Sequence, residues 1–178
     1  MKKVIITGGF LVAMIAFPSM VKAQDTSAGT LTVTGTVASS ITLTVETGTA
    51  GNTLTNAGTN AASTALGTLS KYGTAPQGFT ITPAATTWTL GSTVGVKVLK
   101  ANSTSDAYTL NAKLGSAPAT GVIWSVNAFA LNATTDTALT AAGAYGSTAS
   151  YPWTIQIPDS LATASAIDNV IDFSAIAG

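Results

Sequence analysis

The chain has 178 residues, 46% of them hydrophobic and only 8% charged, and it contains neither histidine nor cysteine. Seven basic and seven acidic residues give no net charge, so the chain lacks the strongly basic balance that is typical of nucleic-acid-binding proteins. Without histidine or cysteine there is no Ser-His-Asp or thiol catalysis, no usual ligand for zinc or copper, and no disulfide.

Residues 1–23 have the layout of a secretory signal peptide. Two lysines at positions 2 and 3 precede an apolar run over residues 4–20, and short residues follow at positions 21 and 23, three residues and one residue before the expected cleavage point. We therefore expect cleavage after Ala23 and a mature chain that begins at Gln24. An uncleaved membrane anchor is the alternative, although the apolar run is short for a span and contains Pro18.

The expected location is outside the cell or on its surface, reached through the periplasm if the source is Gram-negative. No later stretch is apolar over the length that a membrane span requires. The mature chain keeps four lysines and seven acidic residues. This balance predicts neither a nucleic-acid partner nor an anionic membrane surface as partner.

Beyond the signal peptide, apolar and polar residues alternate, which predicts half-buried β-strands and no helix. The first two strands are expected at 30–37 and 41–46. The Gly-, Asn-, Ser- and Thr-rich residues 47–67 are expected to form a long loop with a short strand or turn near its end. Strands at 79–82 and 86–91 follow.

Residues 94–114 are predicted to form a hairpin around the turn-forming residues 102–106. The last strands are expected at 121–131, 152–158 and 169–177. Trp124 and Trp153 fall in phase with the apolar faces of their strands and are predicted to be core residues. About nine antiparallel strands at this spacing indicate an all-β sandwich over residues 38–178, with a closed barrel as the alternative.

No pattern of catalytic residues emerges, and we expect a protein that is not an enzyme and holds no cofactor. Calcium is the one metal with candidate ligands, Asp106 with Asn102 and Asp136 with Asn132, but Asn and Asp also occur in turns for backbone reasons. No metal site is therefore assigned.

A surface for stacking on sugar rings is the main alternative role. Residues 144–153 resemble an exposed aromatic loop, and Tyr145, Tyr151 and Trp88 are the candidate ligand-facing aromatic residues. A free-standing extracellular carbohydrate-binding module is the function that this interpretation predicts.

The stretch GTLTVTGTV at 29–37, immediately after the signal peptide, carries a resemblance to a known family. Together with the strand at 41–45 and the closing IDFSAIAG at 171–178, it resembles the terminal strands of fimbrial (pilin) subunits assembled by the chaperone–usher route. That family usually has a cysteine where Ile41 stands and a tyrosine where Ala177 stands.

The resemblance implies an immunoglobulin-like β-sandwich that lacks its last strand, and a donor arm, residues 24–37, that fills the gap in a neighbouring copy. Leu31, Val33 and Val37 would enter the groove, and Gly35 would occupy a point too tight for a side chain. Burying three such side chains contributes about 5–9 kcal/mol as an upper estimate.

The implied partners are further copies of the chain, a periplasmic chaperone and an outer-membrane usher, in a filament at the cell surface with a role in cell adhesion. The alternative is a free-standing surface or matrix protein whose first strand pairs within its own sheet. The sequence leaves both open.

Overall fold

The computed structural model describes Thr34, residues 41–161 and residues 167–178. Thr34 is exposed and belongs to the unit Met1–Thr36, whereas the other described residues belong to the unit Val37–Gly178. The predicted signal peptide (1–23) and the donor-arm residues Leu31, Val33, Gly35 and Val37 lie outside the described residues. They stay predictions.

In the described part of the chain every regular element is a β-strand and every strand pairing is antiparallel. The prediction of an all-β, antiparallel fold is therefore confirmed. None of the described residues forms a helix that is long and apolar enough to cross a membrane.

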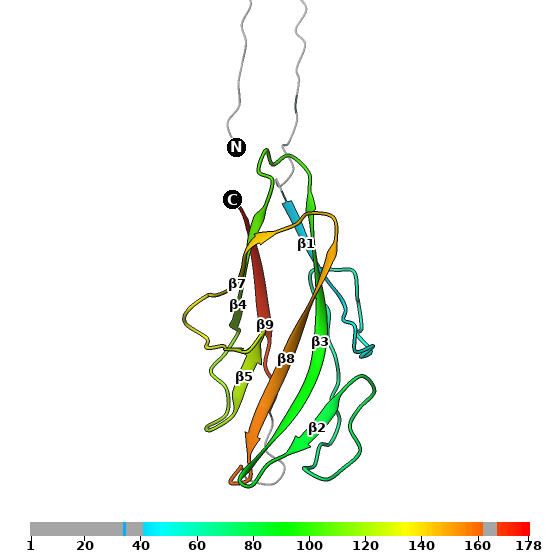
Figure 1. Cartoon of the computed structure of the whole chain (residues 1–178), viewed down its shortest axis with the longest axis vertical. Helices are drawn as coiled ribbons and strands as arrows, with labels where there is room; N and C mark the ends of the chain where they lie inside the picture. The colour runs from blue at the N-terminus through cyan, green and yellow to red at the C-terminus, as the bar shows by residue number, and fades with distance from the viewer. Residues whose placement is uncertain (1–33, 35–40, 162–166) are drawn as a thin grey trace, which may run out of the picture. The chain divides into compact units, whose positions relative to one another are not determined.

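The larger sheet is built on β3 (Thr87–Lys100), a 14-residue strand. One edge of β3 pairs with β8 (Thr148–Pro158), and the other pairs first with β2 (Thr80–Pro83) and then with β1 (Ile41–Thr47). The sheet continues from β8 to β5 (Ile123–Val126) and the short β6 (Phe129–Ala130). Figure 1 shows β3 and β8 running side by side along its centre.

The smaller sheet has the order β7 (Thr137–Gly143), β4 (Tyr108–Leu114), β9 (Ile171–Ala177). Alternate side chains of both sheets point into one apolar core, as a sandwich-like packing requires. The largest fully buried apolar side chains are Leu90, Val96 and Val98 of β3, Tyr108, Leu110 and Leu114 of β4, Val126 of β5 and Ile155 of β8. Trp124 and Trp153 are also buried, so their prediction as core residues is confirmed.

The predicted hairpin over residues 94–114 is wrong. Its two halves, β3 and β4, belong to different sheets, so the turn-forming residues 101–107 connect the two layers of the sandwich. The separate strands predicted at 86–91 and 94–100 form the single strand β3. The chain continues through Gly91 because this residue pairs with Thr80 on one side and Thr154 on the other.

Candidate functional site

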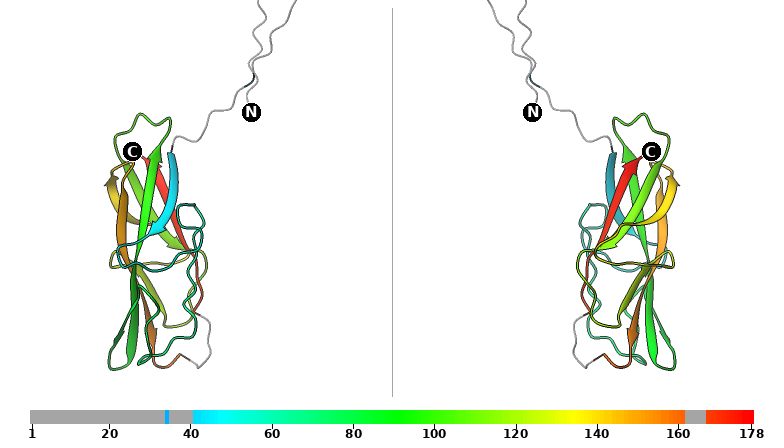
Figure 2. Two further views of the ribbon diagram at one scale, coloured as in Figure 1. Left: turned by 90° about the vertical axis from the view of Figure 1, so that its right-hand side faces the viewer. Right: turned by 90° about the vertical axis from the view of Figure 1, so that its left-hand side faces the viewer.

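β1 is the outermost strand of the larger sheet and β9 of the smaller sheet, and the two strands lie next to each other on one side of the sandwich (Figure 2). The outer edge of β1 is extended by a loop, because the Val45 N–H donates to the Thr59 carbonyl at 2.7 Å and the Gly58 N–H donates to the Val45 carbonyl at 2.8 Å. β9 pairs with β4 on one edge, and no strand in the described part of the chain pairs with its other edge. An unpaired strand edge can accept a further strand.

A groove of about 1400 Å³ lies on this side of the sandwich. We call it the edge groove. β9 and residues 167–170 form one side of it, and β1 with residues 60–71 forms the other. Its apolar lining includes Leu43 and Val45 of β1, Ile171 and Phe173 of β9, and the indoles of Trp88, Trp124 and Trp153. The volume exceeds the roughly 300–1,000 Å³ of ordinary small-molecule pockets, which suits a segment of polypeptide.

The aromatic floor of the edge groove is fixed by ring packing. The rings of Trp124 and Trp153 lie almost parallel, with centroids 6.1 Å apart and an interplanar angle of 6°. The Phe79 ring meets Trp153 edge-on at 5.5 Å. Contacts of this kind hold the indoles in place, so the groove presents a preformed apolar surface.

Two polar residues are buried in the described part of the chain, and only one of them has a partner. Ser92 donates from its Oγ to the Gly78 carbonyl at 2.7 Å. Asn52, which lines the edge groove, is 1% exposed, and neither its Oδ1 nor its Nδ2 has a hydrogen-bond partner. Native proteins rarely leave a buried amide unpaired, but this amide has almost no exposed surface and is not presented to the groove.

The charged residues along the groove include one close ion pair. Lys71 Nζ lies 2.7 Å from Asp159 Oδ2, with the lysine side chain 15% exposed and the aspartate side chain 40% exposed. Lys71 is therefore held by a carboxylate.

Two of the three candidate ligand-facing aromatic residues, Trp88 and Tyr151, are buried, so neither forms an exposed stacking surface. Tyr151 belongs to β8 and pairs in register with Val94, so it shares the inner face with Trp153. Trp88 lies on the inner face of β3. Tyr145 is half-buried, with its ring centroid 5.2 Å from that of Tyr108. The expected exposed aromatic loop at 144–153 is largely the start of β8.

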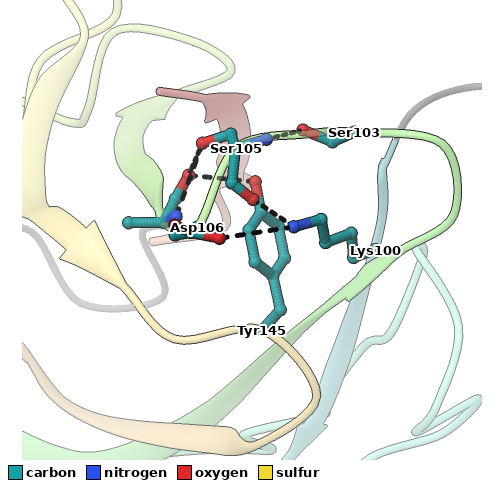
Figure 3. Close-up of polar contacts among 6 residues, drawn as sticks. Lys100, Ser103, Ser105, Asp106 and Tyr145 are labelled. Atoms are coloured by element: carbon teal, nitrogen blue, oxygen red, sulfur yellow. Dashed lines mark hydrogen bonds and ion pairs between the residues drawn. The ribbon is translucent and has the colours of Figure 1, made fainter.

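Tyr145 belongs to a polar cluster where β3 leads into β4 (Figure 3). Its hydroxyl donates to the Ala107 carbonyl at 3.0 Å, and the same carbonyl accepts from Ser105 Oγ at 2.6 Å. Lys100 Nζ donates to the Ser105 carbonyl and lies 5.6 Å from the centre of the Tyr145 ring. These contacts fold the connection between the two sheets against β3.

The candidate calcium ligands are engaged in structural contacts. Asp106 Oδ1 lies 3.8 Å from Lys100 Nζ, and Asp136 Oδ1 lies 3.7 Å from Lys113 Nζ. Asn132 Oδ1 accepts from the main-chain N–H groups at 134 and 135, a turn contact. In the described ranges no three acidic, histidine or cysteine residues gather as a metal site would require.

Sequence reasoning missed the parts of the edge groove that lie outside regular strands. Asn52 and residues 60–71 fall in a stretch whose composition is that of a solvated loop. No pattern in that stretch signals burial. Comparison with known protein families and with curated proteins finds no match to this chain.

Proposed function

We propose that the protein is a non-enzymatic structural subunit of a cell-surface filament, and that it assembles by inserting its N-terminal strand into the edge groove of a neighbouring copy. The observation that carries the proposal is the unpaired edge of β9 beside an apolar groove. The sequence supplies a matching occupant, because residues 29–37 alternate apolar and polar side chains. An added strand would pair with β9 and bury its apolar side against the indoles.

The strand order supports an immunoglobulin-like sandwich with one position open. β1, β3, β8 and β5 follow the order A-B-E-D of that fold, and β4 and β9 correspond to strands C and F. In a complete domain strand G pairs with F, on the edge that β9 leaves without a strand partner in the described residues. β7 departs from the pattern, since it pairs with β4 although it follows β5 in the chain.

The edge groove fits a peptide strand better than a sugar. Its aromatic residues are packed against one another as a floor, and two of the three aromatic residues proposed for sugar stacking, Trp88 and Tyr151, are buried. A chaperone that lends a strand to the same edge before assembly, and an usher that exports the subunits, are the partners that this role implies.

The test is the oligomeric state of the mature chain with and without residues 24–37. We expect residues 24–178 to form ladders that survive SDS without heating, and the shortened chain to run as a single species. Ladders that persist after the deletion contradict the proposal. A mature chain that stays monomeric, with or without its arm, contradicts it as well.

A further inference from the structure

The edge groove stops short of one end of the sandwich and reaches the other. At the end where β1 begins, its lining extends only to Leu43 and Phe173, while Ile41 and Ala175 pack against the core. At the opposite end, where β8 finishes, the lining continues past the strand as far as Asp159. A chain that lies in the groove therefore has room to leave it at the Asp159 end.

The short link behind the arm brings the neighbouring copy to that same end. The free end of the arm is the expected N-terminus at residue 24, whereas its last apolar residue, Val37, is followed by only residues 38–40 before β1 begins at Ile41. Four fully extended residues span at most about 14 Å. In the proposed assembly, the end of the donating copy at which β1 begins therefore lies close to the Asp159 end of the groove.

Tyr72 lies at this end of the groove and is 83% exposed. Its neighbour Lys71 is held by Asp159 at 2.7 Å, and the Gly73 N–H donates to the Ser70 carbonyl at 3.1 Å, which closes a turn around the tyrosine. Lys71 Nζ also lies 5.7 Å from the centre of the Tyr72 ring. The chain thus presents an exposed aromatic side chain on a turn that is fixed in advance, and tyrosine is enriched among the residues that dominate protein–protein contacts.

The end of the molecule at which β1 begins presents an exposed apolar side chain. Leu99 is 42% exposed and pairs in register with Thr42, the second residue of β1. Tyr72 lies at the other end of β3, because the Asp159 N–H donates to the Thr86 carbonyl immediately before that strand. The 14 residues of β3 span about 45 Å, so Tyr72 and Leu99 can meet only between copies (Figure 1).

We propose that Tyr72 packs against the β1-starting end of the donating copy, beside Leu99, and forms a second contact between neighbours outside the edge groove. The contact joins two unlike ends of the molecule and leaves one end of each copy free, so it repeats along an open filament rather than closing a dimer. The inference rests on the proposed function and adds a residue that strengthens the contact between neighbouring subunits.

The first test replaces Tyr72 with alanine in the mature chain, with Phe129→Ala as the matched control. Phe129 is also an exposed aromatic residue, but it belongs to β6 at the edge of the larger sheet opposite β1. The concentration for half-assembly should rise about tenfold for Tyr72→Ala and change less than about twofold for the control. Both variants should keep the melting temperature of the dilute monomer. Wild-type assembly by Tyr72→Ala, or an equal loss in the control, overturns the inference.

The second test combines Tyr72→Cys with Leu99→Cys in a chain that otherwise has no cysteine. We expect disulfide-linked ladders on non-reducing gels of boiled samples, dimers at most from either single variant, and no ladder when Phe129→Cys replaces Tyr72→Cys. No ladder from the Tyr72–Leu99 pair overturns the assignment to the β1-starting end. Those results leave a filament that still depends on residues 24–37, whereas ladders that do not depend on these residues overturn the proposed function itself.

Discussion

Trp124 and Trp153 stack across neighbouring strands, with centroids 6.1 Å apart and planes 6° from parallel. Trp124 comes from β5 and Trp153 from β8, and both indoles line the edge groove. The pair thus serves the sandwich core and also forms the surface that an inserted strand would cover.

Replacing Trp153 with alanine should destabilise the domain by about 3–5 kcal/mol, the usual cost of deleting a large buried aromatic side chain. Both the stacking on Trp124 and the edge contact from Phe79 would be lost. Denaturant unfolding measures the change. Trp153→Phe should cost clearly less, and equal losses for the two variants would contradict the importance of ring packing.

Gly143 lies opposite Tyr108 in the smaller sheet, and a Cβ at Gly143 would overlap the Tyr108 ring. We expect Gly143→Ala to lower the free energy of unfolding by about 1–3 kcal/mol, as overpacking does. Gly91→Ala is the matched control, since a Cβ there meets its nearest atom, Thr154 Cγ2, at an ordinary 3.6 Å. That variant should be neutral or stabilising by up to about 1 kcal/mol, and the same loss in both would refute the steric explanation.

Stability should fall at alkaline pH because two buried tyrosines resist ionisation. Burial, and then the neighbouring Tyr145, raise the pKa of Tyr108, while burial, and then Tyr108, raise the pKa of Tyr151. A raised folded-state pKa favours the protonated form, so this stability is complete below the unfolded value near about 10 and is lost above it. Tyr108→Phe should shift the onset of alkaline unfolding, followed by near-UV circular dichroism, to higher pH. An unchanged onset would count against Tyr108 as a cause.

Gly35→Val should hinder assembly while leaving the folded domain unaffected, because the resemblance to pilin subunits implies that the groove has no room for a side chain at this position. The measurement is ladder formation at equal concentration, with the melting temperature as a check on folding. Thr34→Val is the control, since in the predicted strand it lies on the opposite, polar side. Normal ladders from Gly35→Val would argue against a tight position in the groove.

The alternation of side chains predicted which residues face inward but not which strands pair. Trp124, Trp153 and the apolar residues of β1 fell on the expected faces because period two follows from strand geometry alone. The hairpin at 94–114 was wrong because pairing depends on partners far along the chain, as β3 with β8 demonstrates. β7 escaped prediction because its TALTAAG sequence is poor in residues that favour strands.

The edge groove was predictable only in outline. The resemblance at the chain ends implied a missing strand, but Asn52 and residues 60–71 look like loop in the sequence. Asn52 is buried and residues 60–71, which are exposed or half-buried, line the groove beside residues of β1 and β9. No local pattern in the sequence records that these distant segments come together. Among the described residues, the buried and unpaired amide of Asn52 became visible only with the fold.

The most direct measurement of the central claim uses the absence of cysteine from the chain. Val33→Cys is combined in turn with Ile171→Cys, Phe173→Cys or Ala175→Cys on the inner face of β9, and with Ser125→Cys on the outer face of the larger sheet as control. We predict that at least one β9 pair gives disulfide-linked ladders on non-reducing gels and that the Ser125 pair gives none. A disulfide confined to single molecules, or no disulfide with any β9 position, would contradict strand exchange between neighbouring copies.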